Sequence, residues 1–426
     1  MPDSATQAHT GLKHVARTDV GLRRANNQDS MSVMLAGDEA YWHQRGHVFL
    51  VADGMGAHAA GELASKLAAD GVLHTYSKLL DKTPPDALSS AISETNASIF
   101  QKGQVEPEFR GMGTTCSVLA ILPQGALVGH VGDSRVYRLR DDRFEQLTFD
   151  HSLVWEMMAA GQLSDEKNAP ANVPKNIITR SLGPRAVVAV DLEGPFPLQV
   201  GDRFLLCSDG LSGPVVDEEM GAILASMPLE DAVRSLIDLA NLRGGPDNIT
   251  VITIEITDQA ITQAVGEPFT IPNEKSESGT VHPAFWIVIG MALIGAIGMF
   301  VLDKWPAAAL TLAAAGIVGL IAWIQRSAGT KKKGYVVAGG LLGKGPHRSY
   351  PAAPSSELVE RLKVIAEDLR QAASKEPWKV DWDTIDGPRN NAIVATESGD
   401  LKTAVRQYCQ TIGLLMNQIR GQESKS

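Results

Sequence analysis

The chain has 426 residues, 44% of them hydrophobic and 21% charged, which is enough for one large folded domain and at least one smaller unit. Its net charge of −10 argues against nucleic acid as a principal partner, because phosphate backbones are bound by basic surfaces. The three cysteines, Cys116, Cys207 and Cys409, show neither zinc-ligand spacing nor a disulfide framework, so we interpret them as buried free thiols in a reducing compartment. The first twenty residues lack an apolar core, so we expect no signal peptide and predict a cytoplasmic N-terminal part.

Residues from about 11 to 257 alternate between short β-rich runs and longer helical patterns, without an obvious internal boundary. Strands are expected at 14–18, 30–35, 48–52, 115–122, 126–131, 135–140, 187–192, 203–207 and 249–256. Helical periodicity marks 62–80, 85–101, 153–160, 218–226 and 229–242. Many strands with helices grouped in pairs predict an α+β fold, an α-β-β-α sandwich of two antiparallel sheets flanked by helices.

The next part of the chain predicts a membrane anchor. Residues 259–283 are polar and mixed, as in a linker, and two apolar segments follow at 285–302 and 307–324. Each is about as long as the minimum for spanning a bilayer, so residues 284–325 are predicted to form two transmembrane helices in a hairpin. A buried helix pair is the alternative. The basic residues from Arg326 to Lys333 would stay inside, which predicts a multi-pass protein of the inner (cytoplasmic) membrane with both termini in the cytoplasm.

The C-terminal part predicts a basic, Gly/Pro-rich connector at 326–354 and a small helical tail at 355–426. Apolar stripes at helical spacing place the tail's helices at 356–373 and 401–419. We expect this tail to pack on itself; binding to a partner or to a second copy of the chain is the alternative.

Acidic residues stand at the ends of several predicted strands. Asp53, Asp133 and Asp209 each follow an apolar run, Asp29 lies in ANNQDS, and Asp247 lies in GGPDNIT. Neighbouring carboxylates repel one another unless cations neutralise them, so the pattern favours a site for Mg²⁺ or Mn²⁺. Any one of these motifs could be a plain turn after a strand, but five together favour the metal site.

Eight segments, in order between Thr18 and Ile256, carry a resemblance to a known family. They are TDVGLRRANNQDS, VADGMGAHAAGELAS, GMGTT, HVGDSRVY, DHSLVWEMMAAGQL, ITRSLG, LLCSDGLS and GGPDNITV. These segments resemble the bacterial metal-dependent protein phosphatases of the PPM, or type 2C, family. The resemblance implies a PPM-type phosphatase domain at residues 1–258 and a serine/threonine protein phosphatase that opposes protein kinases.

The resemblance also implies roles for single residues. Asp53 is similar to the carboxylate that bridges two metal ions, and the carbonyl of Gly54 to a ligand of the first. Asp209 and Asp247 match ligands of the second ion, and a third, weaker ion would be shared by Asp133 and Asp209. The predicted cofactors are therefore two core Mn²⁺ or Mg²⁺ ions and a third at this weaker site.

The substrate phosphate is expected to bind Arg24, with Arg23 as a less favoured substitute, while Asp29 would order metal-bound water. A hydroxide bridging the metal ions would attack phosphorus in line with the seryl or threonyl oxygen. The general acid stays open, because Met55 stands where some relatives have a histidine and His58 lies nearby. Residues 154–184 correspond to the family's variable flap beside the site.

The sequence is therefore compatible with three functions. The favoured one is a membrane-anchored phosphatase acting on phosphoserine and phosphothreonine in proteins, with serine/threonine kinases and their substrates as partners. The others are a catalytically weak phosphopeptide-binding or scaffold protein, and a phosphatase of small phosphorylated metabolites.

Overall fold

The structure, a computed structural model, describes residues 11–56, 59–164, 170, 173–174, 177–262, 341–375 and 378–423, with a few single positions between 294 and 309. The chain divides into two compact units, Met1–Phe269 together with Gly339–Ser426, and Thr270–Ala338. Almost all described residues belong to the first unit, so the fold below is the fold of that unit.

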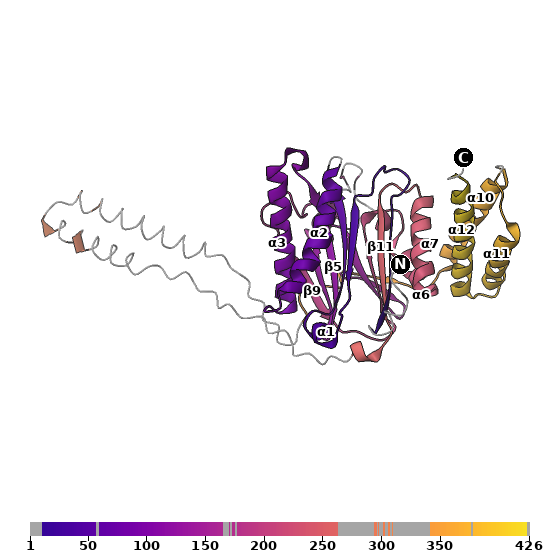
Figure 1. Ribbon diagram of the computed structural model, residues 1–426, viewed down its shortest axis with the longest axis horizontal. Helices are drawn as coiled ribbons and strands as arrows, with labels where there is room; N and C mark the ends of the chain where they lie inside the picture. The colour runs from indigo at the N-terminus through magenta and orange to yellow at the C-terminus, as the bar shows by residue number, and fades with distance from the viewer. Residues whose placement is uncertain are drawn as a thin grey trace. The chain divides into compact units, whose positions relative to one another are not determined.

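Two antiparallel sheets lie face to face within the first unit (Figure 1). One sheet has the strand order β1-β11-β10-β7-β8-β12, with bounds Leu12–Asp19, Ile249–Ile256, Arg203–Cys207, Arg135–Arg140, Arg143–Gln146 and Arg348–Pro351. The other has the order β2-β3-β5-β6-β9, with bounds Asp29–Met34, His47–Met55, Cys116–Leu122, Gly125–Val131 and Asp191–Phe196, and β4 (Gly113–Thr114) pairs with the end of β3. The buried faces meet in an apolar layer that includes Phe49, Leu119, Phe204 and Ile252.

Helices cover the outer face of each sheet, as the sandwich prediction requires. α2 (Ala59–Lys78) and α3 (Pro84–Val105) lie on the β3 sheet, whereas α6 (Asp217–Ser226) and α7 (Leu229–Leu242) lie on the β11 sheet (Figure 1). α3 begins where the Thr83 hydroxyl accepts a bond from the Asp86 amide, with proline in the first turn. The shorter helices are α1 (Glu39–Arg45), α4 (Leu153–Ala159) and α5 (Asp209–Ser212), with 3₁₀ turns at Pro107–Phe109 and Gln259–Ile261. The predicted sandwich of two antiparallel sheets is confirmed.

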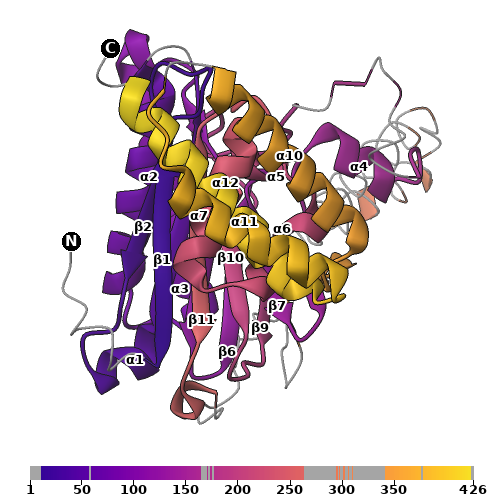
Figure 2. The same cartoon turned by 90° about the vertical axis from the view of Figure 1, so that its right-hand side faces the viewer.

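The C-terminal part of the chain joins this sandwich. β12 pairs with β8, and α10 (Ser356–Lys375), α11 (Trp382–Glu397) and α12 (Leu401–Glu423) form a further helical layer outside α6 and α7 (Figure 2). One apolar cluster runs from Leu236 on α7 to Leu362 on α10 and Tyr408 on α12. The predicted tail helices thus exist, but their apolar faces are buried against the sandwich as well as against one another.

The predicted transmembrane hairpin and the inner-membrane location need correction. None of the helices in the described part of the chain is long and apolar enough to cross a membrane, and most of residues 284–325 lie outside that part. The long C-terminal helices α10 and α12 instead carry one apolar face, which packs on protein. This finding contradicts the predicted multi-pass location.

Candidate active site

Asp53 and Asp29 lie directly opposite each other across the β2–β3 pair, at the end where both strands meet the acid cluster. The backbone of Asp53 is fixed by the GMGTT segment: its amide donates to Thr115 Oγ1 at 2.8 Å, and its carbonyl accepts from the Thr115 amide and the Thr114 hydroxyl, both at 2.9 Å. Gly54 follows in a tight space, because a Cβ there would lie 2.1 Å from the Gly61 carbonyl oxygen. Only glycine therefore lets the end of β3 pack against α2.

Asp133 and Asp209 approach the same place from other strands. Asp133 follows β6, and the hydroxyl of its neighbour Ser134 lies 2.7 Å from Thr115 Oγ1, which links this turn to Asp53. Asp209 follows β10 at the start of α5, and its carboxyl group shares a hydrogen bond with that of Asp53. The three acids predicted at strand ends are therefore brought together.

Asp29 is joined to the opposite sheet by Ser208. The Ser208 hydroxyl donates to Asp29 Oδ2 at 2.7 Å and accepts from the Thr250 amide at 2.9 Å. A serine in this position ties the start of β2 to the end of β10, so it fixes one acid of the cluster relative to the next. Sequence reasoning quoted Ser208 only as part of LLCSDGLS and assigned it no role.

Arg24 lies at the exposed rim of the cluster. Its guanidinium Nη2 donates to Asp247 Oδ2 at 2.7 Å, and 49% of its side-chain surface is exposed. The loop that carries it is held by Asn248, whose amide group accepts from the Gln28 backbone and donates to the Val20 and Asn26 carbonyls. The guanidinium is thus positioned beside the acids and still open to solvent.

Burial and mutual repulsion perturb the acids strongly. Burial, and then the charges of Asp209 and Asp247, raise the pKa of Asp29 to about 7, although hydrogen bonds from Ser208 and Thr250 oppose the rise. Burial followed by the charge of Asp209 also raises the pKa of Asp53 and of Asp133 well above its usual range. Burial likewise raises the pKa of Asp209, with Asp247 adding to it. Raised pKa values in several neighbouring carboxyl groups mean that the protein itself supplies too little positive charge to balance them.

Two observations show that cations fit this cluster. Asp133 Oδ1 and Asp209 Oδ1 are buried and make no hydrogen bond within the described part of the chain, which is costly unless a ligand is bound. The donors are all oxygen atoms, which suit hard divalent cations such as Mg²⁺ and Mn²⁺. No three acidic, imidazole or thiol groups among the described residues already stand in a coordinating arrangement, and one proposed ligand, Asp247, binds Arg24 instead.

The structure thus gathers all the predicted site residues, Arg24, Asp29, Asp53, Gly54, Asp133, Asp209 and Asp247, around one end of the two sheets. Ala57 and His58 lie outside the described residues. Sequence reasoning missed Thr115, Ser208 and Asn248, which position the acids or the loop of Arg24. Each is polar and lies within a quoted motif, but no pattern distinguishes a hydroxyl that supports a site from one that ends a strand.

Comparisons with known proteins show the family to which the chain belongs. The sequence profile of the family described as Protein phosphatase 2C matches residues 23–241. The chain is 39% identical to "Protein phosphatase PhpP" of Streptococcus pneumoniae over 247 residues, which are 57% of this chain and 96% of that protein. The chain belongs to the protein phosphatase 2C family.

Two solved structures extend the likeness to the fold of the phosphatase 2C domain. The S. agalactiae serine/threonine phosphatase has a TM-score of 0.51 and 35% identity, and the match covers 57% of this chain and 99% of that one. The Mycobacterium tuberculosis serine/threonine phosphatase PstP/Ppp has a TM-score of 0.50 and 36% identity, covering 58% and 99%. The chain is therefore a metal-dependent protein serine/threonine phosphatase, which confirms the predicted enzyme class. The family profile ends before α12, β12 and the other C-terminal elements begin.

Proposed function

We propose that this phosphatase hydrolyses phosphoserine and phosphothreonine in proteins at the acid cluster, with Arg24 binding the substrate phosphate. The observation that carries the proposal is the pair of buried, unpartnered oxygens on Asp133 and Asp209 beside the half-exposed guanidinium of Arg24. A cation site next to an open arginine suits a phosphate monoester, whose charge both can bind.

Asp53, the Gly54 carbonyl, Asp209 and Asp247 would hold two Mn²⁺ or Mg²⁺ ions, with Asp133 and Asp209 sharing a third. When bound, such ions supply an activated water and positive charge for attack on phosphorus. Raised pKa values favour protonated acids, so metal binding requires these carboxyl groups to release protons. Hydrogen bonds from Ser208 and Thr250 fix the carboxyl group of Asp29 beside the proposed ligands, where it would order a metal-bound water.

Arg24 acts through its geometry. Its planar fork can exchange the single bond to Asp247 for two bonds to phosphate oxygens. Because the side chain lies at the rim, the phosphate of a protein segment can reach it without the segment entering the fold. Phosphorylated kinases and kinase substrates are the proposed partners.

The test measures hydrolysis of a phosphothreonine peptide and of p-nitrophenyl phosphate by the full chain, with Mn²⁺ and with chelator. We expect activity only with metal, and we expect Asp53→Asn to lower kcat by about a thousandfold or more because it removes a charge that the cations need. Asp142→Asn, at an exposed turn, is the matched control and should keep wild-type activity.

Wild-type activity in Asp53→Asn would reject the assigned site. The alternative function is hydrolysis of small phosphorylated metabolites. The same assay tests it when these metabolites are used as substrates. A kcat/KM for a sugar phosphate above that for the peptide would replace the protein substrate by a small one.

A further inference from the structure

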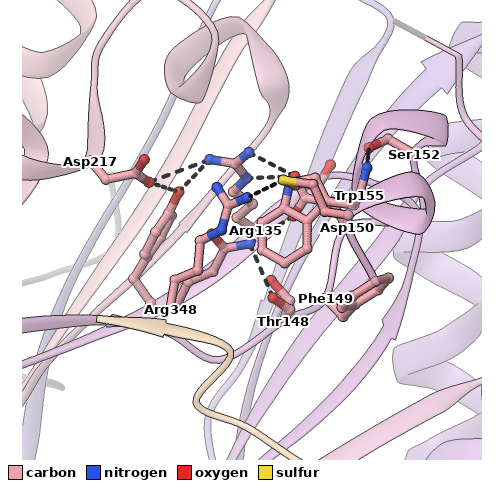
Figure 3. A network of polar contacts seen from close by, with 12 residues as sticks. Arg135, Thr148, Phe149, Asp150, Ser152, Trp155, Asp217 and Arg348 are labelled. Atoms are coloured by element: carbon pink, nitrogen blue, oxygen red, sulfur yellow. Dashed lines mark hydrogen bonds and ion pairs between the residues drawn. The ribbon is translucent and has the colours of Figure 1, made fainter. Parts of the chain in front are cut away.

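Two guanidinium groups from different parts of the chain lie near the ring of Trp155, which is on the short helix α4 (Figure 3). Arg348 of β12 lies 3.9 Å from the ring centroid, and its Nη2 also lies 3.4 Å from the Met158 sulfur on the same helix. Arg135 of β7 lies 5.8 Å from the ring centroid. Trp155 itself is 4% exposed, so these contacts are shielded from water.

Arg135 connects Trp155 to the acid cluster. Its Nε donates to Asp150 Oδ2 at 2.8 Å, and its Nη1 donates to Asp217 Oδ1 at 3.3 Å (Figure 3). Arg135 begins β7, two residues after Asp133. The indole ring of Trp155 therefore lies against a side chain of the strand that starts two residues after a proposed metal ligand.

The polypeptide around α4 borders the acid cluster at both of its ends. At the first end the His151 amide donates to the Gly132 carbonyl, one residue before Asp133. At the second end Leu182 exchanges two backbone hydrogen bonds with Thr114, whose hydroxyl binds the Asp53 carbonyl. These bonds place the residues just before α4 beside the turn that carries Asp133, and the residues around Leu182 beside the strand end that carries Asp53.

Arg348 is held by a segment that does not belong to the family profile. β12 pairs along β8, and just before it Glu193 of β9 accepts bonds from the Lys344 and Gly345 amides at 2.8 and 2.7 Å and contacts His347 at 2.9 Å. Glu193 is 5% exposed. The backbone that carries Arg348 is thus bonded to both sheets, and this holds the guanidinium group against Trp155.

We propose that Arg348 is a positioning residue for binding of the protein substrate: by stacking on Trp155 it fixes α4 against Arg135, and so sets the edge of the active site that a phosphoprotein contacts. This rests on the proposed function of the acid cluster. The consequence is that residues C-terminal to the phosphatase 2C profile take part in substrate binding without touching the substrate.

The test uses the full chain with Arg348→Ala and Arg348→Lys. Loss of a shielded cation–π contact should raise KM for a phosphothreonine peptide by roughly threefold to thirtyfold, with kcat changed by less than about twofold. KM for p-nitrophenyl phosphate, which is too small to reach α4, should stay close to wild type. Arg348→Lys keeps the charge without the planar face and should give an intermediate KM.

Arg370→Ala is the matched control, because Arg370 stacks on Trp382 at 4.7 Å in the C-terminal helices, away from the acids. A rise in peptide KM in Arg370→Ala equal to that in Arg348→Ala would overturn the proposal, as would an unchanged KM in Arg348→Ala. If Arg348→Ala does not fold, Arg348→Lys carries the same comparison.

A double mutant tests the route through the indole ring. Trp155→Leu should raise peptide KM as Arg348→Ala does, and the double variant should add nothing further, whereas additive effects would refute the route. Measuring Mn²⁺ affinity by calorimetry tests the proposed metal site independently of the role of Arg348. The failure of one proposal can therefore be told from the failure of the other. An Asp53→Asn variant that binds Mn²⁺ like wild type would reject the metal site, whatever the Arg348 variants show.

Discussion

The acid cluster and the C-terminal segment are built in opposite ways. The cluster collects residues from six places between Arg24 and Asp247, yet each stands within a short motif at the end of a strand or in a turn. The segment from Leu341 to Pro351 has one strand of four residues, and its position depends on partners about 150 to 200 residues away, such as Glu193 and Gln146. The first region is recognisable from local sequence, and the second only from its contacts.

This difference shows how a segment outside the phosphatase 2C profile can affect the site. The acids need fixed geometry, which hydroxyl and amide groups such as Ser208 and Asn248 supply from inside the sandwich. Among the described residues, the C-terminal segment contacts the chain around α4 through Arg348, which lies against Trp155 and Met158, and through His347, which lies against Phe149. It can therefore alter substrate access without disturbing the metal ligands.

The largest expected effect tests whether the C-terminal segment is as firmly held as the cluster. Glu193→Ala leaves two backbone amides and His347 without their buried acceptor, so the free energy of unfolding should fall by about 3–5 kcal/mol. Urea denaturation monitored by circular dichroism measures it. Glu360→Ala, which removes an exposed partner of Lys363, is the control and should change stability by less than about 0.5 kcal/mol. Equal effects of the two variants would show that the Glu193 contacts do not anchor the segment.

The second prediction, of intermediate size, concerns Arg24 at the exposed edge of the acid cluster. Arg24→Ala should lower kcat/KM by about a hundredfold, because a charged fork that binds the phosphate in the transition state is lost. Arg23 is the matched comparison, since it is adjacent and exposed but makes no side-chain bond to an acid of the cluster within the described residues. Arg23→Ala should therefore keep kcat/KM within about threefold of wild type. A larger loss in Arg23→Ala than in Arg24→Ala would exchange the two roles.

The smallest effect concerns pH and the docking of α12 on α7. Burial raises the pKa of Asp238 on α7 to about 6, against the charges of Arg420 on α12 and Arg234 on α7, while Asp19 on β1 adds to the rise. The folded-state pKa of Asp238 lies above the unfolded value, so the folded chain binds this proton more tightly than the unfolded chain. Proton binding therefore stabilises the fold below pH 4, and this contribution to the free energy of unfolding is lost as pH rises through 6. Asp238→Asn should therefore raise the free energy of unfolding at pH 7.5 by about 1–2 kcal/mol and change it little at pH 4.

Unfolding in urea at both pH values measures this difference. Asp368→Asn, on the exposed face of α10, is the control and should show no such dependence. Destabilisation by Asp238→Asn at pH 7.5 would mean that its ion pair with Arg420, at 3.4 Å, outweighs burial.

Much of the sandwich could be predicted because its strands are strongly patterned. The predicted limits of β7, β10 and β11 agree with the structure, since each is an uninterrupted β-rich run that is buried or paired on both sides. β9 begins at Asp191 rather than 187, where the pairing with His130 of β6 starts. The acids could be predicted because each lies next to such a strand: Asp53, Asp133 and Asp209 lie at or after the end of one, whereas Asp29 and Asp247 lie at or just before the start of one.

The missed elements have weak local signals. β8 and β12 are four residues each and contain charged residues or proline, so only their pairing with neighbouring strands makes them strands. α11 contains Pro388 within its length, which argues against a helix unless tertiary packing supports one. The glycines at 343 and 345 suggested a connector, whereas in the fold they let the backbone wrap around Glu193, because a Cβ at Gly343 would lie 1.9 Å from its Oε2.

The pairing of β8 with β12 also means that the catalytic unit is discontinuous along the chain. Residues 1–269 and 339–426 form one compact body, so a cut anywhere in between would leave two polypeptides that share a sheet and an apolar cluster. Such pieces are expected to stay associated and to be recovered together, as in a split enzyme. Expressed apart, each would expose the apolar face that the other covers, so the two halves should rescue one another's solubility and activity only when they are produced together.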